Sequence, residues 1–384
     1  MTSVAVRTVR TSADLRRFID VPFRLFGSSS HREWVPPLRR SVRRILDPDV
    51  NPFFENADAR LFLAERKGRP VGRIAAIDNR WHTEYHGENV AFFGFFETME
   101  DPDVAAALFD AAEAWARERG RECLRGPTNP SSNYEIGLLV DGFEHIPTFM
   151  TPWNPPYYAP LVEGLGYEGC MDLFGWRLEV SRVDEDMHRR FQLLTRRLVR
   201  KRNISLDTLD MSRFDEELTR AWRVYQEAWG ENWGFCPVTR EEFLFIAREL
   251  KPLIVPDGGI TVSSPEEMVG FTLVLPDYNR GLIHNRNGRL FPLGWLRLLR
   301  ARRHPTWVRC MLTGITRAHQ KTGVVGLLLY EAIKKAPDFG VENVEFSWTL
   351  ENNTDANRAL DNGGAEVYRT WRMYERLLTP PTTS

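Results

Sequence analysis

The residues best suited to chemistry lie in a turn that joins a predicted strand to a predicted helix. Residues 310–335 run from an apolar strand through Gln320 and Gly323 directly into an apolar helix. Glycine lets the backbone pass close to a ligand, and the free N–H groups of a helix's first turn attract an anion. Arg317 and Lys321 add positive charge beside the turn. This pattern predicts a pyrophosphate-binding site, and a glycine that only caps the helix is the alternative.

This turn resembles the signature of the GNAT acyltransferase superfamily, Q/R-x-x-G-x-G/A at a strand-to-helix junction. The matching run is QKTGVV, residues 320–325, in which Val325 replaces the last small residue and Gly326 follows one place later. In that family the junction binds the pyrophosphate of coenzyme A, and the preceding strand binds the pantetheine arm. The resemblance therefore implies acyl-CoA as co-substrate, held by Gly314, Ile315, Arg317, Gln320, Lys321, Thr322, Gly323, Val324, Val325, Gly326 and Asn353.

The resemblance continues beyond the helix. Asn353, Ala356, Leu360 and Gly364 follow a predicted strand, 344–348, at the family's N-x-x-A-x-x-x-Y-x-x-x-G spacing. Leu360 stands where many members have a tyrosine that protonates the departing thiolate. The resemblance therefore implies direct transfer in which another group, or solvent alone, handles that proton.

Further segments resemble a bacterial group of tandem GNAT-like proteins. They are VPPLRR, NPFFENADARLFLAERKGRPVGRIAA, FFGFFE, GPTNPSSNYEIGLLVDGF and PWNPPYY. The bacterial ceramide synthases are similar to this group, and the N-myristoyltransferases and Fem-type aminoacyl transferases are similar more distantly. Similarity to ceramide synthases implies a sphingoid base as acceptor and a long-chain acyl thioester as donor.

A polar segment in the first half of the chain is a candidate for binding the acceptor. Residues 126–142 contain Asn129, Asn133 and Glu135, whose side chains suit hydroxyl or amine groups. Glu135 is a candidate catalytic residue because its carboxylate can take a proton from an ammonium group. The alternative, equally supported, is an ordered loop whose Asn and Ser side chains cap its own backbone.

The neighbouring stretch, 152–158, has the composition of a pocket wall. Its sequence, PWNPPYY, places Asn154, Tyr157 and Tyr158 close together as candidate substrate-binding residues. Their aromatic faces and amide suit an apolar ligand that carries a polar group. A rigid proline-rich connection is the favoured alternative.

Two other sets of ionisable residues have a structural alternative that the sequence favours. Glu97 ends the apolar strand 91–97 and is a candidate catalytic base if burial raises its pKa, but a solvated position is favoured. His82 and His86 are four residues apart, as in a helical metal pair. Since no third ligand appears at a recognisable spacing, a solvated turn is favoured and no metal is expected.

Residues 286–303 combine apolar and basic side chains. In a helix, Leu293, Trp295, Leu296 and Leu299 would share one broad face surrounded by arginines. Such a helix suits a membrane interface with anionic lipids. A helix packed on the sheet with solvated arginines is the favoured alternative, and a lipid substrate would favour the membrane.

Composition excludes several classes of protein. The formal net charge of −1 gives no reason to expect nucleic acid as a partner. Four scattered cysteines without a C-x-x-C pair argue against a disulfide framework and a zinc site. No apolar run reaches the length of a membrane span, and the first residues do not resemble a signal peptide. The predicted location is cytoplasmic, with peripheral contact at the inner face of the membrane as an option.

The elements that must position these residues occur twice in the same order. Each half has a strand, two helices, three strands, a helix and another strand, which predicts an α/β (α+β) protein of two tandem GNAT-like domains. Each domain is expected to have a mixed, mostly antiparallel sheet flanked by helices. Residues 1–182 form the first domain, a degenerate copy on the acceptor side, because acidic residues 98–103 replace the turn. Residues 183–384 form the acyl-CoA-binding domain.

The predicted function is acyl-CoA-dependent N-acyl transfer. The acyl group is acetyl or long-chain, and the acceptor is a small-molecule or lipid amine such as a sphingoid base. Two alternatives remain open. One is a catalytically silent protein that binds an acyl thioester, and the other is a Fem-type transferase that uses aminoacyl-tRNA and binds RNA in a salt-dependent way.

Overall fold

A computed structural model describes residues 3–27 and 31–378 of the chain. The chain forms two compact units that are not contiguous in the sequence. One contains the residues up to Leu173, together with Leu282–Trp295 and the residues from Arg369 onward. The other contains Phe174–Gly281 and Leu296–Tyr368.

In the first unit, β1, β2, β3, β4, β5 and β15 are neighbours in that order in a mixed sheet. Only β4 and β5 pair in parallel among the pairs described in this unit. The elements are β1 (Ala5–Thr8), α1 (Ser12–Phe26), α2 (Arg39–Ile45), β2 (Ala57–Arg66), β3 (Arg69–Asn79), α3 (Arg80–His86), β4 (Val90–Thr98), α4 (Pro102–Glu118), β5 (Cys123–Gly126), β6 (Thr128–Asn129), β7 (Glu135–Ile136), β8 (Leu138–Asp141), α5 (Tyr158–Gly164), β9 (Glu168–Glu179) and β15 (Glu366–Leu377).

Helices cover both faces of this sheet because its strands are apolar on both sides. Successive side chains of a strand point to opposite faces. Ile74 of β3 packs in one core with Leu108 of α4, and Ile77 of the same strand packs in another with Phe18 of α1. All four side chains are buried. The run of apolar residues in β4 follows from this two-sided burial.

In the second unit, β9, β14, β13, β12, β11 and β10 are neighbours in that order, within the same sheet, which has 13 strands in the described part of the chain. Strands β13 and β14 are parallel, and β10 to β13 are antiparallel. The elements are α6 (Glu185–Arg202), β10 (Ser205–Thr208), α7 (Phe214–Trp229), α8 (Arg240–Leu250), β11 (Gly259–Ser263), β12 (Met268–Pro276), α9 (Asn279–Leu282), α10 (Gly294–Arg303), β13 (Trp307–Ile315), α11 (Val324–Ile333), β14 (Asn343–Leu350) and α12 (Thr354–Asn362).

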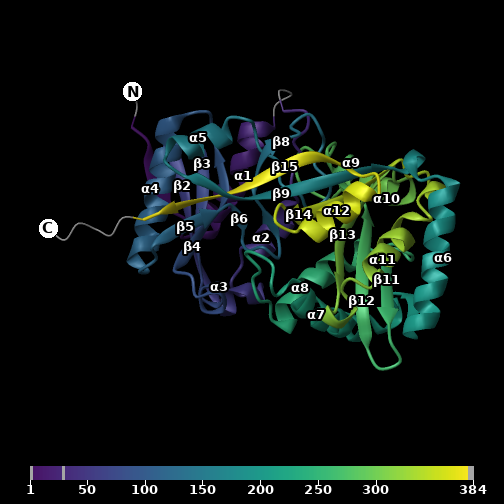
Figure 1. Cartoon of the computed structure of the whole chain (residues 1–384). Helices are drawn as coiled ribbons and strands as arrows, with labels where there is room; N and C mark the ends of the chain where they lie inside the picture. The colour runs from purple at the N-terminus through teal and green to yellow at the C-terminus, as the bar shows by residue number, and fades with distance from the viewer. Residues whose placement is uncertain (1–2, 28–30, 379–384) are drawn as a thin grey trace. The chain divides into compact units, whose positions relative to one another are not determined.

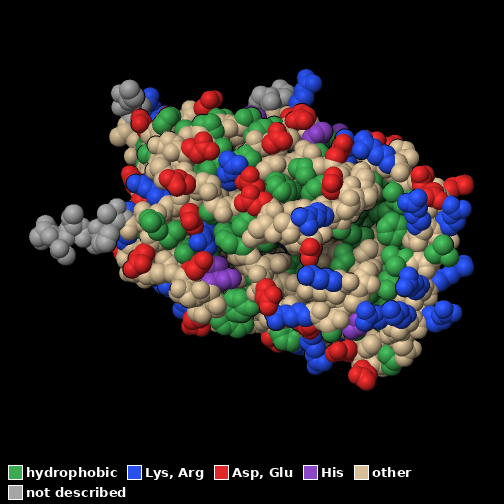
Figure 2. All heavy atoms as spheres, in the orientation of Figure 1, with side chains coloured by type: hydrophobic (Ala, Val, Ile, Leu, Met, Phe, Trp, Pro, Cys, Tyr) green, Lys and Arg blue, Asp and Glu red, His purple; other side chains and the backbone are tan. Residues whose placement is uncertain are grey.

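Helix α11 packs between the strands of the second unit and helix α6. Its Val324 and Leu327 pack with strand residues and with Leu198 of α6. Helix α6 lies beside α11 and stacks Phe191 on Tyr330, with the rings parallel and 5.0 Å apart (Figure 1). The outer face of α6 is strongly basic, as Figure 2 shows.

The repeated order of elements predicted from the sequence is confirmed. The series β1-α1-α2-β2-β3-β4-α4-β5 is matched by β10-α7-α8-β11-β12-β13-α11-β14. The α/β class with mixed, mostly antiparallel sheets is confirmed with it. Within the described residues, none of the helices combines the length and the apolar character needed to cross a bilayer.

Candidate functional site

The turn between β13 and α11 has the backbone geometry expected of an anion-binding site. We call residues 320–326, from the turn into the first turn of α11, the cradle. Gly323 is the N-cap of α11, with φ of 93°, and no side chain caps the helix there. The first bond within the helix runs from the N–H of Leu327 to the carbonyl of Gly323. The N–H groups of Val324, Val325 and Gly326 therefore precede the helical bonding pattern and point out of the helix end. Gly323 itself is exposed.

Helix α6 passes close to the turn, and the backbone conformation at Gly323 requires a glycine. A Cβ on Gly323 would lie 3.3 Å from Cδ1 of Leu198, in a backbone conformation that side chains rarely adopt. A Cβ on Gly326 would lie 3.6 Å from the ring of Phe191. Val325, which replaces the family's last small residue, is half-buried against the core, and its side chain does not fill the cradle. The departure at Val325 therefore leaves the cradle intact.

The charges around the cradle are mixed. Gln320 and Lys321 are exposed in the turn, and Arg317 is also exposed. The Arg317 guanidinium lies 3.1 Å from Glu231, and its backbone N–H donates to Glu227 over 2.6 Å. Lys321 is therefore the turn's cation with the best access to an anion. Thr322 instead turns its hydroxyl back to donate to the carbonyl of His319.

Strand β13 separates from β14 before it reaches the turn. The pairing of the two strands ends at Cys310 opposite Phe346, whereas β13 continues against β12 to Ile315. A register shift against β12 leaves Met311 without an opposite residue, which makes a bulge that bends the strand. The part of β13 beyond Cys310 therefore offers backbone groups to an extended ligand such as a pantetheine arm.

Three predicted cofactor-binding residues have a structural role and offer no free side-chain polar group to a ligand. A Cβ on Gly314 would lie 2.2 Å from the ring of Trp229, so the glycine allows α7 to pack on β13. Ile315 is part of the buried core. Asn353 is the N-cap of α12, where its Oδ1 accepts a hydrogen bond from the N–H of Ala356 over 3.3 Å. These three residues contribute backbone or positioning rather than a free polar group.

A buried polar cluster on β13, β14 and β15 was not predicted from the sequence. Glu345 has no exposed surface, and it accepts hydrogen bonds from the hydroxyls of Ser347 and Tyr368. Arg309 donates to the Ser347 hydroxyl over 2.9 Å and lies 4.0 Å from Glu345. The sequence pattern that could have indicated this cluster is the alternation of polar Glu345 and Ser347 with apolar residues in β14. By contrast, Leu360 is buried in the core and supplies no hydroxyl.

In the first unit, β4 corresponds to β13 and also has a bulge where it separates from β5. The space that this separation would leave beside β4 is filled by other residues of the unit. The pairing of β4 with β5 ends at Phe92, and the register of β4 shifts beyond it. The N–H of Phe95 donates to Oδ1 of Asn129 over 2.6 Å. A Cβ on Gly94 would lie 1.6 Å from the carbonyl oxygen of Thr128, so β6 packs directly on β4. The backbone of β4 that an extended ligand would contact is therefore already in contact with Asn129 and Thr128.

Glu97, one of the two predicted catalytic carboxylates of the first unit, lies in a polar cluster. Glu97 accepts a hydrogen bond from the hydroxyl of Tyr158 over 2.8 Å, and Arg73 lies 3.5 Å away. Burial, with a smaller contribution from the negative charge of Glu135, raises the pKa of Glu97 to about 7. The favoured interpretation of Glu97 as a solvated carboxylate is therefore wrong. Burial also raises the pKa of Tyr158, which remains a hydrogen-bond donor.

The other predicted acceptor residues hold the local backbone. Asn154 is buried, accepts from the N–H of Leu139 over 2.7 Å and donates to the carbonyl of the same residue. Tyr157 donates its hydroxyl to the carbonyl of Thr98 over 2.9 Å. The N–H of Asn133 donates to Ser131 over 3.3 Å. These contacts favour the alternative in which Asn and Ser side chains cap their own loop.

His82 is buried on α3, which corrects the prediction of a solvated turn. Its ring lies 3.3 Å from Glu88, and burial lowers the pKa of His82 to about 4, so the ring is neutral near pH 7. Within the described residues, no group of three or more His, Cys, Asp and Glu side chains is arranged to hold a metal ion.

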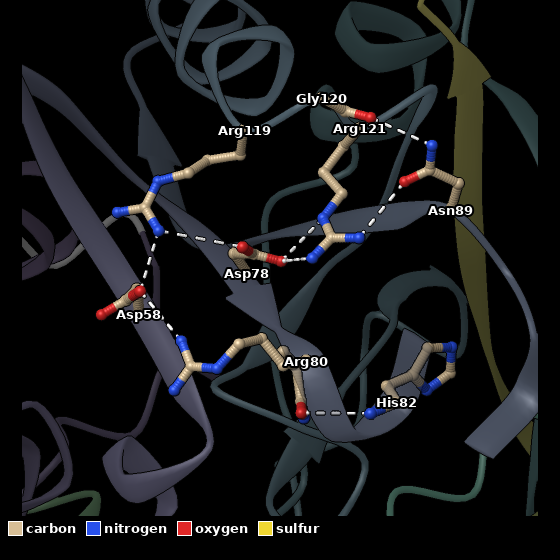
Figure 3. Close-up of polar contacts among 9 residues, drawn as sticks. Asp58, Asp78, Arg80, His82, Asn89, Arg119, Gly120 and Arg121 are labelled. Carbon is tan, nitrogen blue, oxygen red and sulfur yellow. Dashed lines mark hydrogen bonds and ion pairs between the residues drawn. The ribbon is translucent and has the colours of Figure 1, made fainter. Parts of the chain in front are cut away.

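An ion-pair network closes the end of β3 next to α3. Buried Asp78 lies 2.7 Å from Arg121 and 3.9 Å from Arg119, and Arg119 also pairs with Asp58 (Figure 3). Arg80 joins the same Asp58. The network ties the end of α4 to β2 and β3, which is a structural role.

Comparison with known proteins connects the chain to two relatives over its whole length. It is 36% identical to "Bacterial ceramide synthase" of Caulobacter vibrioides (strain NA1000 / CB15N), with 98% of both chains aligned. It is 34% identical to "Protein YghO" of Escherichia coli (strain K12), with 97% of this chain and 95% of the relative aligned. No family model matches the chain.

Solved structures share the fold at low sequence identity. A tandem GNAT protein from the clavulanic acid biosynthesis pathway aligns with 98% of this chain and 99% of its own, with a TM-score of 0.55 and 15% identity. A GCN5-related N-acetyltransferase from Sphaerobacter thermophilus aligns with 98% and 96%, with a TM-score of 0.53 and 13% identity. These similarities show a shared fold.

Proposed function

The chain belongs to the tandem GNAT group that includes these two relatives, and from this premise we propose that it is an N-acyltransferase that uses an acyl-CoA thioester. The observation that carries the proposal is the open cradle at Gly323, where free amides begin α11. Backbone N–H groups and the helix dipole stabilise a bound pyrophosphate without a metal. The exposed Lys321 would add a further charge to that site.

The proposed acceptor is a long-chain amine. The relative named a bacterial ceramide synthase matches this chain from end to end. Ceramide is the amide of a fatty acid with a sphingoid base, so its formation joins an acyl group to an amine nitrogen. We therefore propose a sphingoid base or a similar lipid amine as acceptor, and a long-chain acyl-CoA as donor.

The proposed reaction is a direct displacement. The neutral amine attacks the thioester carbonyl, a C–N bond forms, the C–S bond breaks, and coenzyme A leaves as a thiolate. Backbone N–H groups of β13 beyond Cys310 would stabilise the negative charge that develops on the carbonyl oxygen. The amine loses one proton and the thiolate gains one. Since Leu360 supplies no hydroxyl, our candidate for holding the proton is the cluster of Glu345 and Tyr368.

A thiol-release assay tests this proposal. The full chain is mixed with acyl-CoA thioesters of increasing chain length, with and without sphinganine or a short amine, and free coenzyme A is measured together with the amide product. We expect release that requires both a long-chain donor and a lipid amine. Binding without turnover for any amine would instead support a catalytically silent protein, and binding of aminoacyl-tRNA without affinity for coenzyme A would support a Fem-type transferase.

A matched pair of glycine variants connects the activity to the cradle. Gly323 and Gly340 both have positive φ, 93° and 72°, but nothing lies within 4 Å of a Cβ at Gly340. A valine at either position carries a similar backbone strain of about 1–2 kcal/mol. We expect Gly323→Val to lower turnover about tenfold or more and Gly340→Val to leave it nearly unchanged. An equal loss of turnover in both variants would contradict a role of the cradle in the activity.

A further inference from the structure

Exposed apolar side chains are concentrated where α10 begins. Four large apolar side chains are exposed within six residues: Phe291 (74%), Leu293 (58%), Trp295 (45%) and Leu296 (44%). The described chain contains ten exposed large apolar residues, and no other six-residue stretch has more than one of them. Such a concentration costs solubility and marks an interaction surface. The predicted alternative, in which this helix packs its apolar face on the sheet, does not apply to these four side chains.

The local backbone holds these side chains outward. The N–H of Trp295 donates to the carbonyl of Leu290 over 2.9 Å, and the N–H of Arg289 donates to Oδ1 of Asn287 over 2.9 Å. A Cβ on Gly294 would lie 2.7 Å from the carbonyl oxygen of Arg289, so the backbone folds tightly on itself at that glycine. The loop before the helix is thus a hydrogen-bonded turn with its apolar side chains facing solvent.

The charged residues that flank this turn in the sequence have one sign. The sequence contains no acidic residue between Asp277 and Glu331. Arg289, Arg300 and Arg303 are exposed, and among the described residues no ion pair joins them to a carboxylate. Tryptophan, phenylalanine and leucine flanked by arginine form the composition of a segment that lies in a bilayer interface.

We propose that residues 289–303 dock the protein on an anionic lipid bilayer, with Phe291, Leu293 and Trp295 inserted and the arginines at the headgroups. The apolar side chains need a nonpolar phase, which a nucleic acid does not offer. The uninterrupted positive charge needs an anionic surface. The inference stands on this segment and not on acyl transfer, although a lipid amine acceptor would be reached from the same bilayer.

Vesicle co-sedimentation of the full chain tests the inference. We expect binding to phosphatidylcholine vesicles that contain phosphatidylglycerol, weaker binding to pure phosphatidylcholine, and a decrease with added salt. The triple variant Phe291→Ser, Leu293→Ser, Trp295→Ser should lose affinity for the anionic vesicles about tenfold or more. Because these side chains are exposed, the variant should unfold at the temperature of the wild type, which shows that loss of binding is not loss of fold.

Two controls make the result specific. Phe339→Ser combined with Leu377→Ser removes two other exposed apolar side chains, at 55% and 79% exposure, and should bind like the wild type. Arg189→Gln combined with Arg190→Gln lowers the charge of α6 (Figure 2) and should change binding less than Arg289→Gln with Arg300→Gln. No binding by the wild type, or equal losses in the test and control variants, would overturn the proposal. Binding of coenzyme A by the same variants is measured separately by calorimetry, so the two proposals fail independently.

Discussion

At the scale of single residues, Lys321 is the cation whose removal should weaken donor binding most selectively. It is exposed in the turn with φ of 57°, and Lys67 is an exposed lysine with φ of 52° in a turn of the first unit. We expect Lys321→Glu to raise the Kd for coenzyme A about tenfold, which corresponds to about 1.4 kcal/mol, while Lys67→Glu leaves it unchanged. Calorimetric titration measures both, and a similar change in the two variants would contradict a local role.

Glu97 should make stability depend on pH in a defined window. Its pKa is raised by burial from 4.5 to about 7, so the folded protein holds this proton more tightly than the unfolded chain. Its contribution to stability is therefore full below about pH 4.5 and is lost as the pH rises through about 7. Glu97→Gln keeps an acceptor for Tyr158 but does not titrate. We expect the wild type to lose up to about 3 kcal/mol relative to this variant across that window, measured by urea unfolding at several pH values. A constant difference would contradict the assignment.

At the scale of elements, Asn129 is expected to stabilise the packing of β6 on the bent part of β4 in the first unit. Its Oδ1 accepts from the N–H of Phe95 over 2.6 Å in the bent part of β4. Asn129→Ala leaves that donor without its partner and should cost about 1–3 kcal/mol of unfolding free energy. Asn129→Asp keeps an acceptor and should cost less. Thermal unfolding of both variants checks this, and an alanine variant as stable as the wild type would show that the contact is dispensable.

Elements with a clear apolar period could be predicted from the sequence, and elements set by tertiary contacts could not. Helix α4 spans Pro102–Glu118, and its apolar residues recur at helical spacing in the sequence. The polar sequence of α3 gave no such pattern, and the helix depends on Asn79 as N-cap and on burial of His82. The cradle at Gly323 was predictable because its chemistry is local. The partners of Glu97 and of Glu345 were not, because they come from distant parts of the chain.

At the scale of the whole molecule, the repeated order of elements was visible in the sequence, but the composition of the compact units was not. Leu282–Trp295 and the residues from Arg369 onward belong to the first unit although they lie in the second half of the chain. Pairs such as Tyr374 with Gly126 join strands that no periodicity connects. The division at 182 and 183, with a separate role for each half, stays a prediction.

We expect a single donor site in each chain. The opening in the first unit is used by Asn129 and β6, and residues 98–103 are acidic where the second unit has its cradle. Titration of the full chain with coenzyme A, followed by calorimetry, tests this claim most directly. We expect saturation at one molecule per chain, with weaker binding for Lys321→Glu. Absence of measurable binding, or saturation at two molecules per chain, would contradict it.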